Sequence, residues 1–389
     1  MIGEVVFELK FPRSFVVVEF RGHGMLLKHG RLLTLSLPLL LISQVAVAYR
    51  ADRESRTSAR GLGMGNAVIN SERRSNAVFY NPANLAAKNT GTTLEVINMK
   101  FTGSDGLFAQ YGRSSNINVL SLNAMYTGLQ NYPNTIARGG LSVFPNFTMR
   151  NLHLGMLYEV DQGAKVRAED SALRVFGRDR FGPVAALSFR LLSGILRIGA
   201  SVEYMTIGNA NKTITSPNPN NISFAEHLDT GAGLRKNAGA TLTFPVPFLP
   251  SFSAVARDIG GTSYSGSPLI KFGNGRIATT DAMSIDLAAG MTIYIGGRIE
   301  IKLEADWKDF YNSIGGSRIN HLFGGGEIIF WDLINFRGGY SNGYPTYGFG
   351  ITTRAGSLNL AIYTDELDDR PRTQPDTRYV LQYQFGVFK

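Results

Sequence analysis

Apolar and polar residues alternate along most of the chain after about residue 115. In the stretch 298–309, charged residues occupy every second position: Arg298, Glu300, Lys302, Glu304, Asp306 and Lys308. The positions between them are apolar: Ile299, Ile301, Leu303, Ala305 and Trp307. Successive side chains of a β-strand point to opposite faces, so this stretch predicts a strand with a charged inner face and an apolar outer face. The same alternation recurs at 196–204 and 378–387.

The length and spacing of these strands predict a membrane barrel. Each run has about ten residues, which cross a bilayer as a tilted strand, whereas about five to six residues are usual in a soluble sheet. Candidate interface aromatics lie near strand ends: Tyr158, Tyr204, Tyr294, Trp307, Tyr340 and Tyr363. Short connections near 151, 192–193, 245–250, 296, 331–332 and 355–356 alternate with long ones near 161–180, 209–234, 260–282 and 365–377. This rhythm is typical of periplasmic turns and outer loops.

The fold class predicted is therefore all-β, a transmembrane antiparallel β-barrel of about 14 strands. About thirteen strands are expected between 138 and 388, and a further one near 115–127 gives an even number. The segment 92–101 is left over, so it belongs to the N-terminal segment or the count is wrong by two. The barrel is expected over 111–389.

A secretion signal is expected near the N-terminus. Met25 to Arg31 is basic, 32–45 is apolar, and Ala46-Val47-Ala48 fits an A-x-A cleavage site. We expect a signal peptide over 25–48, a mature chain that begins at Tyr49, and an over-extended gene start over 1–24. The alternative is a membrane anchor, since an apolar run of about 17 residues is at the lower limit for a span.

Composition restricts the classes of function. The 389 residues include no cysteine, which excludes disulfides, thiol catalysis and cysteine metal sites. Hydrophobic residues make up 44% and charged residues 18%, with a mean hydropathy of −0.03, as alternating strands require. The net charge is +9, but the basic residues are scattered, and a secreted chain of this kind predicts no nucleic-acid partner.

No catalytic or metal-binding pattern is recognised. Beyond the signal, His153, His227 and His321 are far apart and have no metal-ligand spacing. No phosphate-binding loop of the G-x-x-x-x-G-K-[ST] type occurs. The acidic run 365–369 is interpreted as a solvated loop rather than a Ca²⁺ site. We expect no enzymatic activity, no cofactor and no metal.

Residues 49–110 are polar and glycine-containing, and they do not fit a spanning strand. Such a segment can fill a barrel lumen as a plug, because irregular backbone finds polar partners there. Phe79, Tyr80 and Leu85 favour burial, which argues against the alternative of a disordered periplasmic tail.

This segment resembles the start of the FadL-type long-chain fatty-acid transporters of outer membranes and their relatives in hydrocarbon uptake. The residues that carry the resemblance are Gly63, Met64, Gly65, Phe79, Tyr80, Asn81, Pro82 and Ala83, followed by Leu85. The resemblance implies a fourteen-stranded barrel with an N-terminal hatch. It also implies a hydrophobic ligand that binds inside and leaves when the hatch shifts, or exits sideways through the wall.

Three features depart from that pattern. The charged face of 298–308 differs from a greasy channel, Arg73 and Arg74 replace the usual small and acidic residues, and the chain ends in Phe388-Lys389 rather than in an aromatic residue. The stretch Gly338–Gly350 is also similar to non-transporting, secretion-associated relatives.

The leading hypothesis is an outer-membrane channel that takes up hydrophobic small molecules, foremost long-chain fatty acids. The alternative is a structural or secretion-associated barrel without such transport. The partners expected are outer-membrane lipids, the hydrophobic ligand and the barrel-assembly machinery.

Overall fold

The structure is a computed structural model that describes residues 56–87, 92–111, 121–149, 151–215, 217, 222–277, 280–313, 315, 318–366 and 374–387. The gene-start extension, the signal peptide, the mature terminus and the chain end at Phe388-Lys389 lie outside the described residues.

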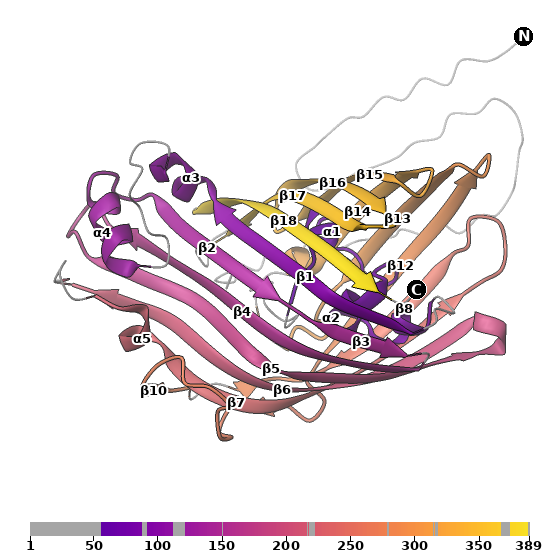
Figure 1. The fold of residues 1–389 in the computed structure, drawn as a ribbon, viewed down its shortest axis with the longest axis horizontal. Helices are drawn as coiled ribbons and strands as arrows, with labels where there is room; N and C mark the ends of the chain where they lie inside the picture. Colours follow the sequence, from indigo (N-terminus) through magenta and orange to yellow (C-terminus); the bar gives the residue numbers. More distant parts are fainter. Residues whose placement is uncertain are drawn as a thin grey trace, which may run out of the picture. The chain divides into compact units, whose positions relative to one another are not determined.

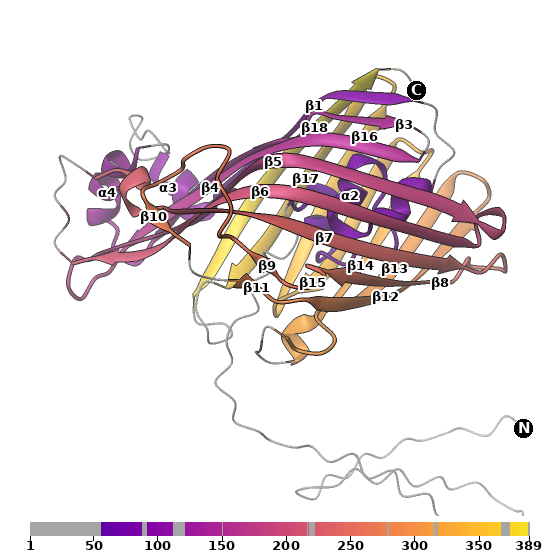
Figure 2. The ribbon, with the colours of Figure 1, turned by 90° about the horizontal axis from the view of Figure 1, so that it is seen from below.

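Fourteen antiparallel strands form a closed barrel (Figures 1 and 2). Each strand pairs with its neighbours in the chain, and β18 pairs with β1 to close the ring. The wall consists of β1 Thr93–Ser104, β2 Ile136–Val143 with its continuation β3 Asn146–Met149, β4 Leu152–Val166, β5 Leu173–Leu191, β6 Leu196–Ile214, β7 Asp229–Thr243, β8 Ser251–Arg257, β12 Ser284–Ile295, β13 Ile299–Trp307, β14 Leu322–Phe330, β15 Ile334–Ser341, β16 Tyr344–Thr353, β17 Gly356–Glu366 and β18 Pro375–Val387. The fold class predicted from the alternation is confirmed.

The alternation decides which side chains face inward. On β13 the charged residues after 298 are buried, whereas Leu303 on the opposite face is 46% exposed. On β6 Ser201 and Glu203 are buried, whereas Ile198 and Val202 are exposed. The outer faces are thus apolar and the inner faces polar, as a barrel wall in lipid requires.

Two assignments at the start of the barrel were wrong. The leftover segment 92–101 is a wall strand, β1, which pairs with β18 on one side and with β2 on the other. The segment expected as a strand near 115–127 contains the helix α4 Leu122–Gln130 instead. Its buried residues follow helical spacing, not alternation: Leu122, Met125, Tyr126 and Leu129. The barrel therefore begins at Thr93 rather than at 111.

The connections differ between the two ends of the barrel. The six short connections predicted from the sequence all lie at one end, which we call the short-turn end. The other end, the long-loop end, carries most of the long connections, but 161–180 is not a loop, because β4 continues to Val166 and β5 begins at Leu173. β5 and β6 have 19 residues each. At this same end, β15 and β16 are joined only by Asn342-Gly343, with φ of +51° and +89°, as in a tight hairpin.

Short elements complete the described part. At the long-loop end are α3 Asp105–Tyr111, α4, α5 Phe224–His227, β9 Thr262–Ser263, β10 Gly275–Arg276, β11 Thr280–Asp281 and the 3₁₀ turn η4 Arg318–His321. β9 pairs with β11, and β10 pairs in parallel with β7. The 3₁₀ turn η3 Leu192–Gly194 connects β5 to β6. Within the described residues, no helix is long and apolar enough to cross a membrane.

Residues 56–87, called here the N-terminal segment, fold into short turns of helix. They are α1 Ala59–Gly63, η1 Arg74–Asn76, α2 Ala77–Tyr80 and η2 Pro82–Ala87. α1 packs against β15–β18, and η2 packs against β5, β6 and β7. These strands belong to opposite parts of the ring, so the segment lies between them, as Figure 2 shows for α2.

Candidate functional site

The first part of the site is where the Gly63-Met64-Gly65 turn meets the wall. A Cβ atom on Gly63 would lie 2.8 Å from the Cα of Gly348 on β16. Gly65 has φ of +64°, a conformation that favours glycine. Its N–H donates to Thr346 Oγ1 (2.8 Å), and that hydroxyl donates to the Gly63 carbonyl (3.2 Å).

Glycines of the wall supply the other half of this contact. A Cβ atom on Gly325 of β14 would overlap the Met64 carbonyl, and one on Gly339 of β15 would overlap Met64 and Gly65. Backbone therefore packs directly on backbone across three strands, which only glycine permits. We call this contact the glycine seat; its wall residues are Gly325, Gly339 and Gly348.

The second contact involves Asn81 and Pro82 and lies on β6 and β7. Asn81 Nδ2 donates to Thr241 Oγ1 (2.9 Å) and to the Ile69 carbonyl (3.2 Å). Asn81 Oδ1 accepts the N–H of Ala83 at 3.0 Å, which closes the turn at Pro82.

The wall residues beneath this turn are glycines, which have no side chain. A Cβ atom on Gly199 would lie 2.5 Å from the carbonyl carbon of Pro82, and one on Gly239 would overlap Asn81. Both halves of the motif recognised in the sequence therefore lie against wall glycines.

The aromatic pair between these contacts is buried. The ring of Phe79 meets that of Phe144 edge to face, with centroids 4.8 Å apart. The Tyr80 hydroxyl donates to Asn66 Oδ1 (3.0 Å) and accepts the N–H of Ser58 (3.1 Å). Arg257 on β8, which also pairs with Asp286, donates to the carbonyls of Phe79 and Tyr80, each at 2.8 Å.

The charged face of β13 contacts the N-terminal segment. Asp306 Oδ2 accepts the backbone N–H groups of Val68 (2.9 Å) and Ile69 (3.1 Å), and Glu304 accepts that of Asn70. Two wall carboxylates thus bind three consecutive donors of an irregular turn, which satisfies buried N–H groups that no regular ladder reaches.

The remaining predicted charges of that strand have different surroundings. Lys302 Nζ lies 3.4 Å from Glu300 and 3.7 Å from Glu327. Lys308 Nζ lies over the rings of Tyr80 and Phe323, at 5.6 Å and 4.8 Å from their centroids. Arg298 is not on the inner face: it is exposed in the turn before β13, because the strand starts one residue later than expected.

Glu327 on β14 is the centre of an ion-pair network. Its carboxylate binds Arg60 of the N-terminal segment (2.7 Å) and Arg337 of β15 (2.6 Å). Arg60 also pairs with Glu72 at 3.3 Å, and burial raises the pKa of the Glu72 carboxyl. The sequence analysis missed this network. The available signal was the alternation of Glu327 and Arg337 with apolar residues along their strands, which indicates an inward position.

Arg56 is another buried cation of the segment that the sequence analysis missed. Its guanidinium donates to Ser142 Oγ (2.7 Å), Asn76 Oδ1 (2.7 Å) and Asn98 Oδ1 (2.9 Å). Burial lowers the pKa of Arg56 to about 10. No spacing rule pairs these positions, which lie on separate elements.

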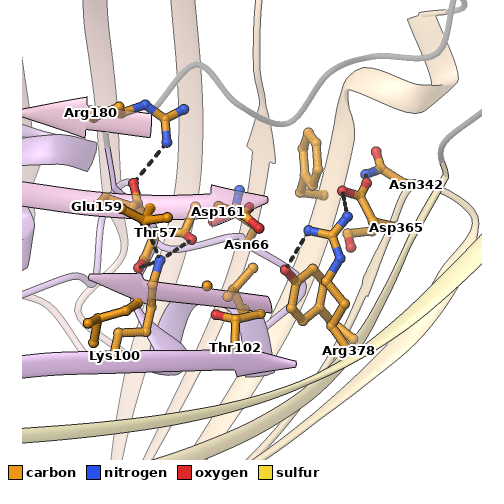
Figure 3. Close-up of a pocket in the computed structure, with 17 residues that line it drawn as sticks. Thr57, Asn66, Lys100, Thr102, Glu159, Asp161, Arg180, Asn342, Asp365 and Arg378 are labelled. Atoms are coloured by element: carbon orange, nitrogen blue, oxygen red, sulfur yellow. Dashed lines mark hydrogen bonds and ion pairs between the residues drawn. The ribbon is translucent and has the colours of Figure 1, made fainter. Parts of the chain in front are cut away.

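A polar cavity lies between the N-terminal segment and the long-loop end (Figure 3). Two clusters of charge line it: Lys100 and Arg180, each paired with Glu159 at 2.9 Å and 2.8 Å, and Arg378, paired with Asp365 at 3.1 Å. The cavity volume is about 50 Å³, and a water molecule needs at least about 10–15 Å³, so the cavity has room for a few waters. It is not a preformed pocket for an apolar molecule.

Tyr363 lines this cavity and accepts a hydrogen bond from Arg378 (3.1 Å), so it does not belong to the interface aromatics where the sequence analysis had placed it. Tyr158 and Tyr340 are exposed on the outer surface of the barrel, whereas Tyr294 is exposed at the short-turn mouth and donates to the inward-facing Glu300 (3.2 Å).

Apolar side chains gather instead at the long-loop end. We call this group the outer cluster; it comprises Leu107, Leu122, Met125, Tyr126, Leu129, Ala137, Ala164, Val166, Leu173, Val175, Ala210, Ile222, Phe224 and Leu228, with Ile214 and Phe272 packed against it. Its members come from α3, α4, α5 and the long-loop ends of β2, β4, β5 and β6 (Figure 1). The long strands thus carry an apolar core beyond the charged lumen.

The described residues contain no group of three or more His, Asp or Glu side chains that could hold a metal ion. His153 donates to or accepts from Thr148 (2.8 Å), and His321 and His227 lie on other elements. In the acidic run, Asp365 and Glu366 contact Asn342 and Tyr344, and 367–369 lie outside the described residues.

No protein-family model matches the sequence, and no curated protein resembles it significantly in sequence. Solved structures do resemble it. The monoaromatic hydrocarbon channel CymD is 12% identical, with a TM-score of 0.50, over 86% of this chain and 97% of that chain. A deltaS2S3 mutant of the monoaromatic hydrocarbon channel TodX is 12% identical, with a TM-score of 0.51, over 85% of this chain and 98% of that chain. The chain has the fold of these FadL-type channels, so the resemblance seen in the sequence is confirmed at the level of the fold.

Proposed function

We propose that the protein is an outer-membrane channel for hydrophobic small molecules and that the N-terminal segment is its plug. The observation that carries the proposal is a fourteen-stranded barrel with the fold of hydrocarbon channels, in which an irregular segment contacts opposite walls. The short-turn end then faces the periplasm and the long-loop end faces outward. In this orientation the outer cluster is the apolar surface that an incoming molecule meets first.

The substrate proposed from the family resemblance is a long-chain fatty acid. The competing candidate is a monoaromatic hydrocarbon, because the similar solved structures are channels for such compounds. Burial of an acyl chain gains about 0.8 kcal/mol per CH₂. The polar cavity offers no such surface, so we propose that the plug moves during passage, or that the molecule leaves through the wall.

A disulfide lock distinguishes these routes, because the chain has no native cysteine. Asn84 Oδ1 and Thr241 Oγ1 lie 3.1 Å apart across the contact of plug and wall. Cells that carry Asn84→Cys/Thr241→Cys and lack other fatty-acid channels are tested for uptake of radiolabelled oleate and toluene, with each single variant as control.

If the plug moves, oxidation blocks uptake and reduction restores it. If the lock forms and uptake persists, the molecule exits through the wall. If the reduced protein takes up neither compound above cells without it, the channel proposal is wrong.

One observation favours a second function, a structural or secretion-associated barrel without transport. The lumen is crossed by paired charges at Glu327 and Glu159, and its cavity holds only a few waters. A reduced protein that is folded in the outer membrane and inactive with both compounds would support this reading.

A further inference from the structure

Two arginines face each other at the short-turn end without a carboxylate between them. Arg190 on β5 and Arg197 on β6 are directly opposite in the register, next to the turn that joins the two strands. Directly opposed residues project from the same face of a sheet, and like charges in this position destabilise it. Neither arginine forms an ion pair with any carboxylate among the described residues.

The face of the sheet that carries them is the inner one. Arg197 is two residues from Gly199, which lies under Pro82 of the plug, and Arg190 is two residues from the buried Ser188. Since side chains alternate, both arginines point to the lumen side of the wall. They are therefore the first inward residues below the contact at Asn81.

A third arginine comes from the plug itself. Arg73 is 52% exposed and lies at the same end of the barrel, because its neighbour Glu300 is the second residue of β13, after the short turn at Gly296. Arg73 forms an ion pair with Glu300 at 3.9 Å, and that carboxylate also lies 3.4 Å from Lys302 and accepts a hydrogen bond from the Tyr294 hydroxyl at 3.2 Å.

One donor of this group has no partner among the described residues. Arg197 donates to Thr243 Oγ1 at 3.3 Å, but its Nε is shielded from solvent and has no hydrogen-bond partner. A buried donor without a partner destabilises the folded state. Guanidinium groups bind carboxylate and phosphate oxygens in pairs of parallel hydrogen bonds, so a single oxoanion would relieve both the repulsion and the unpaired donor.

We propose that Arg73, Arg190 and Arg197 form an oxoanion site at the short-turn mouth that binds the carboxylate or phosphate head group of an amphiphile. That the ligand is an amphiphile rests on the proposed function, because a channel for apolar molecules brings the apolar chain of such a ligand to this mouth. The oxoanion chemistry rests on the three arginines alone.

The test uses the full-length protein in neutral detergent at low salt, with calorimetric titration of octanoate, octyl phosphate, octanol and inorganic phosphate. We expect octanoate or octyl phosphate to bind at least ten-fold more tightly than octanol. Arg190→Gln/Arg197→Gln should reduce that affinity to the level of octanol. Arg354→Gln, at another exposed turn of the same end, is the matched control and should bind like the wild type.

A second measurement excludes a merely structural role. In the absence of ligand, Arg190→Gln should raise the thermal unfolding midpoint, because it removes the opposed charge. A lower midpoint, equal binding of octanol and the charged probes, or wild-type affinity in the double variant would overturn the proposal. If inorganic phosphate binds as tightly as octyl phosphate, the amphiphile part is wrong and the ligand is a free oxoanion. Toluene uptake is measured separately, so failure of the channel proposal is distinguishable from failure of this site.

Discussion

At the scale of single residues, the contact between the N-terminal segment and the wall depends on glycines, which have no side chain. The backbone of Gly63, Met64 and Gly65 meets Gly325, Gly339 and Gly348 of the wall so closely that a Cβ atom on Gly325 or Gly339 would overlap it, and one on Gly348 would lie 3.0 Å from the Cα of Gly63. A glycine inside a strand weakens the strand, and close approach of another backbone is the usual physical reason for its presence. The glycine seat therefore fixes where the N-terminal segment can lie.

Replacing a single seat glycine should dislodge the plug. In Gly339→Ala the new methyl group overlaps Met64 and Gly65, and overpacking of this kind costs about 1–3 kcal/mol. We expect higher conductance in planar bilayers while the heat-dependent gel mobility of the folded barrel is retained. Gly338→Ala, one residue away on the outer face with no atom within 4 Å of its Cβ, is the matched control. Equal conductance of the two variants would show that the seat does not hold the plug.

Asn81 should hold the other side of the plug. Asn81→Ala removes hydrogen bonds to Thr241, Ile69 and Ala83, and an unpaired buried group costs about 1–3 kcal/mol. We expect altered uptake or conductance with native gel mobility, since the wall ladder does not depend on this amide. Asn131→Ala, an exposed position after α4, should leave both unchanged. Wild-type conductance and uptake in Asn81→Ala would contradict the prediction.

At the scale of elements, charge pairs connect strands to the plug. Glu327 of β14 joins Arg60, Arg337 and Lys302, which come from three different elements. Removing one member of a buried charge group leaves the others desolvated and unpaired, which destabilises more than the intact group stabilises.

Glu327→Gln should therefore be strongly destabilising although it preserves shape. We expect a loss of about 3–5 kcal/mol in the free energy of unfolding, measured by urea titration in lipid vesicles. The control is Glu226→Gln on α5, where the side chain is exposed and the expected change is within about 0.5 kcal/mol. A loss below 1 kcal/mol in Glu327→Gln would mean that water reaches the network.

At the scale of the whole molecule, the barrel separates three environments. Its outer face is apolar, its lumen contains paired charges and the N-terminal segment, and an apolar core lies at the long-loop end. The two mouths also differ, since Arg190, Arg197 and Arg73 all lie toward the short-turn end.

The lipid-facing side can be tested at Leu303, in the middle of β13. A charge at the midplane on the lipid face costs about 2–4 kcal/mol, so Leu303→Arg should fold poorly into vesicles. Leu303→Phe should fold like the wild type, because an aromatic ring is accommodated by lipid. Gel mobility after refolding into vesicles separates the cases: loss of folding in both variants would indicate a packed site, and normal folding in both would indicate an aqueous face.

The sequence by itself determined the wall of the barrel. Strict alternation at 299–307 assigns one face to lipid and the other to the lumen, and it does so locally, because the period of a strand is two. Short turns and the Gly63–Gly65 and Asn81–Pro82 pattern were visible for the same reason: each depends on neighbours in the chain. The strand number agreed only because the strand expected near 115–127 was counted in place of β1.

Tertiary structure alone decided what these elements meet. Residues 93–104 form a wall strand because they pair with β18, almost 300 residues later. Leu122 and Met125 are buried because helix α4 packs in an apolar cluster with residues of β4 and β5. Glu327 could be assigned to an inward face, but its partners Arg60 and Arg337 follow from ring closure and from the position of the plug. The opposition of Arg190 and Arg197 likewise requires the register of the hairpin. Local periodicity specifies which way a side chain points, whereas long-range pairing specifies what it touches.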